Sequence, residues 1–192
     1  MNIAIITQSI NTHSGSRAPL ELAKNLAKNN QITIYSYPHK ADKNLISILE
    51  KLKIYVVLLP HNNQSIINQI KNTLELSKKL RNSDCDIVSS HCLPPLFMAT
   101  WFLKIPTVAT YYGTQKNVLK EKFFPEKLSP INYLAEKILN LVISLEQWII
   151  VNTTSKTIAI SQHSKKEAHK LYHRKINHIY LGSISKNLKN EQ

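Results

Sequence analysis

The sequence begins with Asn2-Ile3-Ala4-Ile5-Ile6-Thr7-Gln8-Ser9, a near-continuous apolar run. Such a run is typical of a strand that is buried on both faces in the middle of a parallel sheet. It is followed by a polar turn around Gly15 and by an amphipathic helix from about Arg17, with Leu22 and Leu26 on one apolar stripe. A strand, a glycine turn and a helix together form half of a nucleotide-binding βαβ unit.

The rest of the chain alternates predicted strands with predicted helices. The further strands are expected at residues 31–36, 53–60, 86–90, 105–112, 157–160 and 177–181. Helical spacing predicts helices up to residue 52 (capped by Asp42 or Asn44) and over about 64–80, 94–103, 131–149 and 162–172. This pattern predicts a doubly wound, Rossmann-like, mostly parallel sheet of about seven strands with helices on both faces. We expect one domain over residues 1–184, and a polar tail or the start of an interdomain linker over residues 185–192.

Two of the predicted helices carry apolar residues at helical spacing. In the helix over 64–80, the residues expected to face the sheet are Ile66, Ile67, Ile70 and Leu74. In the long helix, the residues interpreted as core are Ile131, Leu134, Ile138, Leu141, Val142, Leu145, Trp148 and Ile149. Both helices are therefore predicted to bury these apolar faces.

The charge of the chain is strongly positive, with 25 basic and 12 acidic residues among 192 and a formal net charge of +13. The lysines are spread along the chain, which favours a compositional bias together with some contact with an anionic surface. No nucleic-acid module and no basic stripe with interleaved aromatics is present, so we expect no nucleic-acid partner. One basic-aromatic group is typical either of a patch that rests on an anionic membrane or of an exposed loop with a buried Phe pair. It consists of Lys116, Lys120, Lys122, Phe123, Phe124 and Lys127.

Cysteine usage and the remaining segments indicate the compartment. Cys85 and Cys92 are the two cysteines, and their spacing fits neither a disulfide framework nor a metal site. The sequence enters a strand at once without the features of a signal peptide. Its most apolar long segment, residues 134–151, contains Glu136, Lys137, Asn140 and Glu146, which favours a core helix over a membrane span. We expect a cytoplasmic protein.

Ligands of doubly wound sheets bind beyond the carboxyl ends of the strands. That rule brings together the Gly15 turn, His91, Tyr112 with Gly113, and Ser161. Backbone amides at a glycine turn and a helix N-terminus favour anions, and Arg17 adds a charged donor. Gly15, Ser16 and Arg17 are therefore interpreted as a phosphate-binding loop, with a simple tight turn as the alternative.

The other candidates each have two interpretations. His91 binds a hydroxyl of a ligand or only completes its strand. Tyr112 is better suited to positioning or stacking on a ligand than to proton transfer, since the reference pKa of tyrosine is about 10. Ser161 is more typical of a helix cap than of a reactive group. His169 and His173 lack a third ligand, so no metal is expected.

Five motifs occur in one order along the chain: Ser14-Gly15-Ser16-Arg17 with its helix, Asp86-Ile87-Val88-Ser89-Ser90-His91, Pro106-Thr107-Val108-Ala109-Thr110-Tyr111-Tyr112-Gly113, Ile158-Ala159-Ile160-Ser161, and Ile179-Tyr180-Leu181-Gly182. In this order they resemble the N-terminal domain of GT-B-fold, family-4-type (group 1) glycosyltransferases, nearly from end to end. The resemblance implies half of a GT-B fold and a retaining transfer of a hexose from a nucleotide sugar to a saccharide or lipid-linked acceptor. It also implies that Gly15, Ser16 and Arg17 contact the donor phosphate and that the acceptor cleft contains His91, Tyr112, Gly113 and Ser161. It implies no cofactor.

The sequence departs from that family in three ways. The loop has a single glycine, Gly15, and Tyr112 stands where the family has a cleft histidine. The second domain, which in the family binds most of the nucleotide sugar, has no counterpart in these 192 residues. The resemblance thus implies an acceptor-side domain that is inactive without a C-terminal donor domain or a partner subunit. A non-catalytic sugar- or protein-binding module is the alternative, and the expected location is the cytoplasm or the inner membrane face.

Overall fold

The structure is a computed structural model that describes residues 1–12, 14–38, 41–61, 66–91, 96–101, 103–113, 137, 141, 144–145, 148–149, 151–173 and 176–179. Its strands are β1 (Asn2–Ile6), β2 (Gln31–Ser36), β3 (Ile54–Leu58), β4 (Ile87–Ser90), β5 (Thr107–Tyr111), β6 (Lys156–Ala159) and β7 (Asn177–His178). Its helices are α1 (Ser14–Leu26), α2 (Lys43–Lys51), α3 (Ile66–Arg81), α6 (Gln162–Tyr172) and the 3₁₀ helix η2 (Leu96–Thr100).

The strands form one sheet in the order β3-β2-β1-β4-β5-β6-β7, and every neighbouring pair is parallel. The strand order reverses between β1 and β4, which is where ligands of such sheets bind. In the register of the central strands, Ile5 lies between Ile34 of β2 and Ser89 of β4. The predicted doubly wound, Rossmann-like sheet is confirmed.

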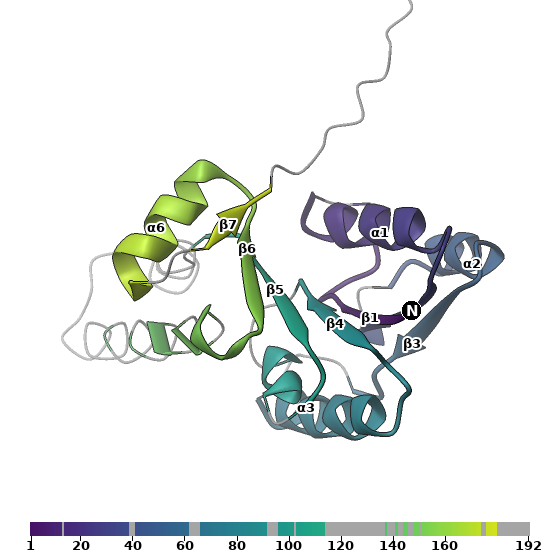
Figure 1. The fold of residues 1–192 in the computed structure, drawn as a ribbon. Helices are drawn as coiled ribbons and strands as arrows, with labels where there is room; N and C mark the ends of the chain where they lie inside the picture. The colour runs from purple at the N-terminus through teal and green to yellow at the C-terminus, as the bar shows by residue number, and fades with distance from the viewer. Residues whose placement is uncertain are drawn as a thin grey trace, which may run out of the picture.

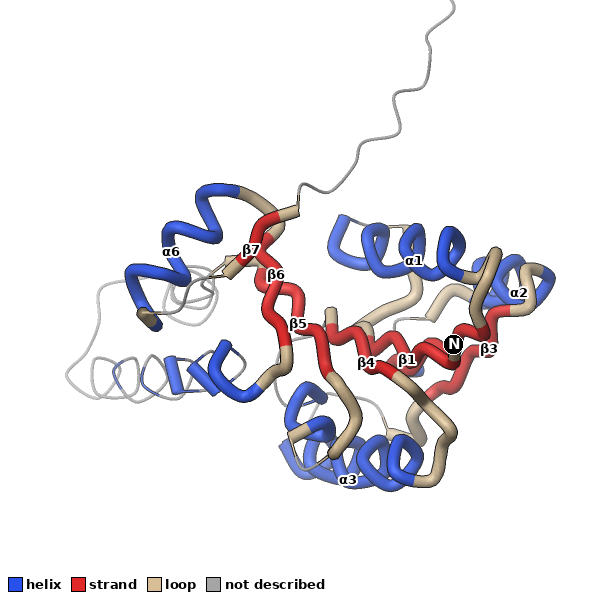
Figure 2. The backbone as a smooth tube through the Cα atoms, in the orientation of Figure 1, coloured by secondary structure: helices blue, strands red, loops and turns tan. Residues whose placement is uncertain are grey.

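Helices cover both faces of the sheet (Figure 1), and Figure 2 shows the strands as one layer between them. On one face, Leu20 and Ala23 of α1 and Leu49 of α2 pack on the apolar side chains of β1 and β2. On the other, Leu76 and Leu80 of α3 pack on the opposite side chains of the same strands. β1 is therefore buried on both faces, as its continuous apolar run predicts.

The start of α2 was predicted from its capping residue. Asp42 precedes the helix, and its Oδ1 accepts hydrogen bonds from the backbone N–H of Asn44 at 2.9 Å and of Leu45 at 3.3 Å. These bonds satisfy amides that have no partner inside the helix. The cap fixes where α2 begins.

The orientation of α3 differs from the prediction. Ile67, Ile70 and Leu74, expected against the sheet, are 66%, 53% and 66% exposed, whereas Leu76 and Leu80 on the opposite stripe are buried. The side chain of Ile66 lies outside the described residues. The prediction was wrong because α3 has two apolar stripes, and a polar residue decides which one faces inward.

That polar residue is Asn72, which is fully buried. Its Nδ2 donates to the carbonyl of His61 at 2.7 Å, and its Oδ1 accepts from the backbone N–H of His61 at 3.1 Å. An amide satisfied in both directions can be buried at little cost, whereas the same burial without partners is unfavourable. The paired amide thus holds the stripe of Leu76 and Leu80 against the sheet.

Two other helical faces were also assigned wrongly. In the long helix, Leu141, Leu145 and Trp148 are exposed, and among its described residues Ile149 is buried. In α1 the assignment is wrong only in part, because Leu22 is exposed while Leu26 of the same predicted stripe packs on the core with Leu20 and Ala23. The remaining members of the long predicted stripe lie outside the described residues.

Two predicted helix bounds also change. α1 begins at Ser14, three residues before the predicted start, so Gly15 lies in its first turn. Pro19 lies inside α1, where it cannot donate the usual hydrogen bond to the carbonyl of Gly15. The helix predicted over 94–103 is the shorter 3₁₀ helix η2 in its described part. No helix in the described ranges is long and apolar enough to cross a membrane.

Candidate functional site

His91 follows β4 at the point where the strand order reverses. Its backbone N–H donates to the carbonyl of Ile6 at 2.8 Å, which places it beside the carboxyl end of β1. Its Nε2 lies 3.0 Å from the hydroxyl of Ser89, and its Nδ1 lies 3.1 Å from the hydroxyl of Tyr112. The two rings meet edge to face, with centroids 6.4 Å apart. The structure therefore brings two of the predicted site residues together.

The electrostatics of His91 follow from its burial, which lowers its pKa to about 4. The imidazole is therefore neutral near pH 7, with one nitrogen that donates and one that accepts. One of the neighbouring hydroxyls must donate to the ring, and the other must accept from it. A neutral ring whose two nitrogens are both held by hydroxyls is suited to orienting the phenol of Tyr112 and is a poor reservoir of protons.

Gly113 directly follows Tyr112 at the end of β5 and has a φ of +117°. This backbone conformation is one that residues with a Cβ rarely adopt. A Cβ at this position would lie 3.4 Å from Oε2 of Glu167 and 3.9 Å from the hydroxyl of Ser164. The glycine thus lets the chain turn sharply against α6 immediately after Tyr112.

Glu167 of α6 also holds the end of β5. The hydroxyl of Tyr111 donates to Oε2 of Glu167 at 3.1 Å, and the rings of Tyr111 and Tyr172 meet edge to face at 6.1 Å. Burial raises the pKa of Tyr111, and the neighbouring Tyr172 and Glu167 raise it further. Tyr111 therefore stays protonated and keeps donating to the carboxylate. This contact fixes the strand end that carries Tyr112.

Ser161 has the role of a helix cap. Its hydroxyl oxygen accepts from the backbone N–H of Ser164 at 3.1 Å, and its carbonyl accepts from that of Lys165 at 3.0 Å. The more favoured of its two interpretations is thereby observed, and α6 begins next to the loop that contains Gly113.

The β1–α1 segment differs from the predicted glycine turn. Gly15 lies in the first helical turn of α1, and the link back to β1 is a hydrogen bond between the hydroxyls of Ser9 and Ser16. Ser16 is buried. Because its hydroxyl is engaged by Ser9, a ligand at this helix end would meet backbone amides in the first instance.

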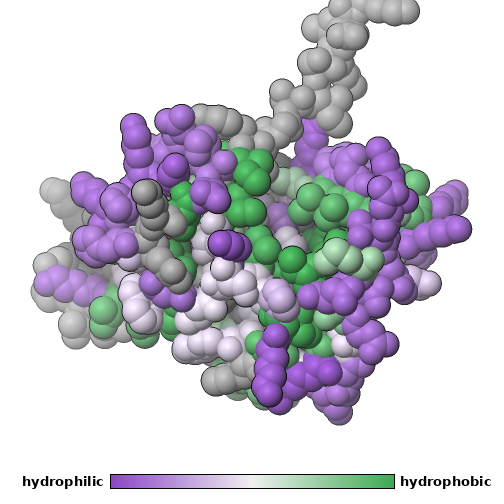
Figure 3. Space-filling view, in the orientation of Figure 1, coloured by the Kyte–Doolittle hydropathy of each residue, from purple (hydrophilic) through white to green (hydrophobic). Residues whose placement is uncertain are grey.

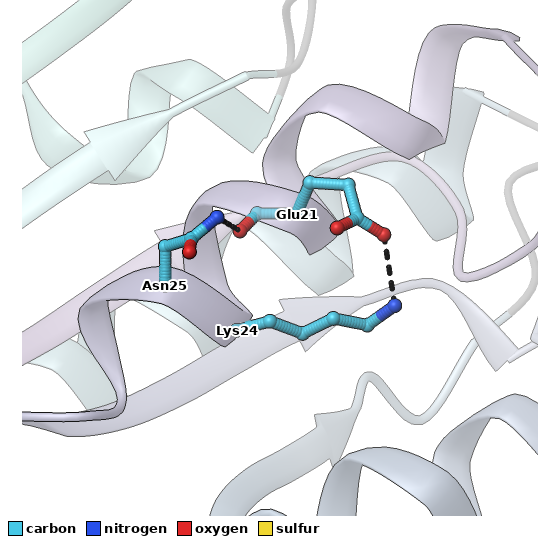
Figure 4. A network of polar contacts seen from close by, with 3 residues as sticks. All are labelled: Glu21, Lys24 and Asn25. Carbon is cyan, nitrogen blue, oxygen red and sulfur yellow. Dashed lines mark hydrogen bonds and ion pairs between the residues drawn. The ribbon is translucent and has the colours of Figure 1, made fainter. Parts of the chain in front are cut away.

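Arg17 lines a separate hollow of about 220 Å³ between α1, α2 and the segment after β1. The hollow is lined by Asn11, Thr12, Arg17, Leu20, Glu21, Lys24 and Leu45. Within it, Lys24 forms an ion pair with Glu21 at 2.8 Å (Figure 4), which balances the charge of Lys24. Arg17 has no ion pair within the part of the chain that the structure describes, so it supplies the hollow with its free positive charge.

Two further hollows that are lined by described residues lie away from this edge. One of about 220 Å³ is formed at the amino ends of β1 and β2 and includes Asn2, Gln31 and Cys85. Burial raises the pKa of the Cys85 thiol, which makes it a weak nucleophile. Over the described ranges, no group of three or more His, Cys, Asp or Glu side chains is placed to hold a metal ion.

The sequence matches the family model of Glycosyltransferase Family 4 over residues 16–182. The chain belongs to this family. A comparison with curated proteins finds no match. The family match spans the whole sheet except β1, and it includes His91, Tyr112, Gly113 and Ser161.

Solved structures share the fold of this family-4 chain. Anabaena Alr3699/HepE in complex with UDP and glucose aligns with a TM-score of 0.64 and 18% identity, over 95% of this chain and 45% of that one. The lipopolysaccharide outer core galactosyltransferase WaaB aligns with a TM-score of 0.61 and 13% identity, over 94% of this chain and 45% of that one. The UDP-GlcNAc 2-epimerase from Methanocaldococcus jannaschii aligns with a TM-score of 0.55 and 15% identity, over 95% of this chain and 46% of that one. The chain spans less than half the length of these relatives and corresponds to one half of a GT-B fold.

The sequence analysis did not identify some residues that the structure places at the candidate site. Ser89, Glu167 and Ser9 each contact a predicted site residue or the strand end that carries it. For Ser89 a signal exists, because it lies two residues before His91 on the same side of β4. For Glu167 none exists, since it is 56 residues from its partner Tyr111. The predicted basic-aromatic patch over 116–127 lies outside the described residues.

Proposed function

We propose that this chain is the acceptor-side N-terminal domain of a retaining family-4 glycosyltransferase that uses a nucleotide sugar. The observation that carries the proposal is the His91–Tyr112 pair at the strand-order reversal, where ligands of such sheets bind. Membership of the family and the fold shared with a protein solved with UDP and glucose support it.

In this proposal the His91–Tyr112 pair binds the acceptor. The imidazole of His91 holds the phenol of Tyr112, and the phenol can accept or donate a hydrogen bond, which suits the hydroxyls of a saccharide or a lipid-linked saccharide. The aromatic ring of Tyr112 offers a face for stacking on a sugar ring. Gly113 and Ser161 shape the same edge, because one sets the turn after Tyr112 and the other begins α6.

The donor diphosphate lies, in this proposal, at the first turn of α1. The free backbone N–H groups there and the helix dipole favour an anion, and Gly15 allows a close approach. Arg17 adds positive charge on the side of the hollow. The negative charge that develops on the leaving diphosphate would be stabilised by these groups without any cofactor.

A second domain is needed for transfer, because the chain covers only 45% of a solved glycosyltransferase. We propose that residues 1–184 form the acceptor-side domain, that residues 185–192 are a polar tail or the start of an interdomain linker, and that a C-terminal domain or partner subunit binds most of the donor. The proposed location is the cytoplasm, at or near the inner membrane face. The same coverage favours one alternative, a non-catalytic domain that binds a sugar or a protein.

The test measures transfer by the 192-residue chain alone and after a donor-binding domain is supplied. Nucleotide release from UDP-glucose and related donors, with saccharide acceptors, should appear only in the second case. Tyr112→Phe should raise the KM for the acceptor about fivefold, because one hydrogen bond to a neutral group contributes roughly 1 kcal/mol. Tyr55→Phe, on the exposed side of β3, should leave KM unchanged.

Two results would contradict the proposal. One is tight binding of a nucleotide sugar to the isolated chain, which would place the donor site here. The other is saccharide binding that persists while no donor domain restores transfer, which would favour the non-catalytic alternative.

A further inference from the structure

Ser89 is a polar residue in an otherwise apolar row of the sheet. In the register of the strands it lies between Ile5 of β1 and Val108 of β5, and Ile34 of β2 follows beyond Ile5. Paired residues of parallel strands point to the same face of the sheet, so aliphatic side chains flank Ser89 on both sides. A hydroxyl among such neighbours is unfavourable unless it has a hydrogen-bond partner. The hydroxyl of Ser89 therefore depends on a partner outside this row.

That partner is the imidazole of His91. The two residues lie two positions apart, on the same side of the extended chain, and Oγ of Ser89 lies 3.0 Å from Nε2 of the ring. Within the described ranges, this is the one hydrogen bond that the hydroxyl of Ser89 forms. The same ring contacts the hydroxyl of Tyr112 through Nδ1 at 3.1 Å. Ser89, His91 and Tyr112 thus form one chain of hydrogen bonds from β4 to the residue that follows β5.

The neutral ring allows two arrangements of this chain. Burial lowers the pKa of His91 to about 4, so near neutral pH the imidazole has one N–H and one nitrogen that accepts. In the first arrangement, the N–H of Nε2 donates to Ser89, and Nδ1 accepts from Tyr112. In the second, Ser89 donates to Nε2, and the N–H of Nδ1 donates to Tyr112. The two arrangements differ in whether His91 holds the hydrogen of the Tyr112 phenol or binds to its oxygen.

The acidity of the two hydroxyls favours the first arrangement. The reference pKa of tyrosine is about 10, whereas the aliphatic hydroxyl of serine is a much weaker acid, so the phenol is the better donor. The phenol oxygen is also the poorer acceptor, because its lone pairs are partly delocalised into the aromatic ring. The hydrogen of Tyr112 is therefore directed at Nδ1 of His91, and the N–H of Nε2 is directed at Ser89.

We infer that Ser89 is a positioning residue of the proposed acceptor site. By accepting the N–H of Nε2, it selects the tautomer of His91 in which Nδ1 accepts the phenol hydrogen of Tyr112. The phenol oxygen then meets a ligand with its lone pairs. It therefore selects a group that donates, such as a saccharide hydroxyl or an amide N–H, over a group that only accepts, such as an ether oxygen. This inference rests on the proposed function and names the kind of group that its acceptor site recognises.

The tautomer is measured first, on the 192-residue chain without donor or acceptor. Long-range proton–nitrogen correlation spectra of the isotope-labelled chain distinguish a protonated ring nitrogen from an unprotonated one, and the signals that disappear in His91→Gln belong to His91. His91 is expected as the tautomer with the proton on Nε2. A proton on Nδ1 in the parent chain would overturn the inference, and this measurement does not depend on the folding of any Ser89 variant.

Ser89 is then exchanged in matched variants. Ser89→Ala should lower the ratio of the Nε2–H tautomer to the Nδ1–H tautomer about fivefold, the factor that corresponds to one hydrogen bond between neutral groups. Ser89→Thr keeps the hydroxyl and should change the ratio by less than about twofold. Thr110→Val removes a hydroxyl from a half-buried position of β5 and is the control, which should leave the ratio unchanged. An unchanged ratio in Ser89→Ala, or an equal loss in Thr110→Val, would overturn the role of Ser89.

Transfer kinetics test the same inference at the ligand, once a donor-binding domain has been supplied. Ser89→Ala should raise the KM for a saccharide acceptor by up to about fivefold and leave kcat unchanged, and Ser89→Thr should leave both unchanged. An absence of transfer in every combination would contradict the proposed function and leave the tautomer result standing, so the two can fail separately.

Analogues of the saccharide acceptor test the direction of the hydrogen bond to Tyr112. The hydroxyl that contacts the phenol is the one whose removal raises KM for the parent chain but not for Tyr112→Phe. At this hydroxyl, the deoxy and deoxyfluoro analogues should raise KM equally, because neither can donate to the phenol oxygen. A deoxyfluoro analogue with a clearly lower KM than the deoxy analogue would show that the phenol donates to the ligand, and it would overturn the inference.

Discussion

The two halves of the sheet differ in how completely they are covered. Around β1 and β2, buried side chains pack against α1 and α2 on one face and against α3 on the other. Around β5 and β6, the described buried cluster consists of Tyr111, Val151, Ala159, Ala168, Tyr172 and Ile176. The other side chains of these strands, such as Val108, Thr110 and Ile158, are only half-buried. Figure 3 shows apolar surface between the hydrophilic surfaces over α1 and α6.

This difference indicates that the first half mainly stabilises the fold and that the second half carries the proposed acceptor site. The first half has the side chains with the largest burial, including Ile5, Ile32 and Ile34. The second half has a hydroxyl-rich strand end, a positive-φ glycine and a helix that begins beside it. We therefore expect substitutions in the first half to act on folding, and those in the second half to act on the proposed acceptor site.

The largest expected effect is in the first half. Ile5→Ala removes a fully buried side chain of β1 and should lower the free energy of unfolding by about 2–5 kcal/mol, because a cavity remains in a packed layer. Val108→Ala, on half-buried Val108 of β5, should cost no more than about 1 kcal/mol. Urea denaturation of both variants measures the difference. Equal losses would show that the second half is packed as tightly as the first.

A smaller effect is expected at the boundary between the halves, from the protonation of His91. Its pKa is about 4 in the folded chain and about 6.5 when unfolded, so the unfolded chain binds more protons between these values. The free energy of unfolding should therefore fall as pH decreases from about 7 to about 4, by up to about 3 kcal/mol, with no further loss from this group below that.

His91→Gln should flatten this part of the stability profile, measured by urea denaturation at a series of pH values. His163→Gln, at an exposed position of α6, is the matched control and should leave the slope in place. A parent chain with a flat profile between pH 7 and pH 4 would contradict the burial of His91 as its cause.

The smallest effect is expected from replacing a glycine by alanine, a change that can be made once in each half. Gly113→Ala should lower the free energy of unfolding by about 1–3 kcal/mol, because it forces a Cβ into a backbone with φ of +117° and close to Glu167. Gly15→Ala, in the first turn of α1, should raise it by up to about 1 kcal/mol, since alanine is favoured in helices. Thermal denaturation followed by circular dichroism separates the two. Destabilisation by both variants would place Gly15 in a conformation other than helical.

The sequence was sufficient for the sheet and insufficient for the helical faces. Short apolar or alternating runs between helical patterns predicted the strands, and the continuous run of β1 predicted a strand buried on both faces. The faces of α3 could not be chosen, because two apolar stripes compete and the outcome depends on the bonds between Asn72 and the backbone of His61. Hydrophobic spacing does not report such a long-range contact.

The sequence predicted which edge of the sheet carries the candidate site, but it did not predict the contacts within that site. The rule for doubly wound sheets was enough to group His91 with Tyr112. Their hydrogen bond, the cap at Ser161 and the link from Tyr111 to Glu167 depend on side-chain positions set by packing. Gly15 was misplaced because a glycine followed by a helix is compatible with both a turn and a first helical turn.

The proline inside α1 has a consequence for amide hydrogen exchange. Pro19 cannot donate to the carbonyl of Gly15, and the first amides of any helix have no partner within it, so few intrahelical bonds hold residues 14–17 to the rest of α1. These amides should exchange with deuterium faster than those of residues 20–26. A bound diphosphate would slow exchange in this turn alone, which offers a readout of donor contact in a chain that transfers nothing.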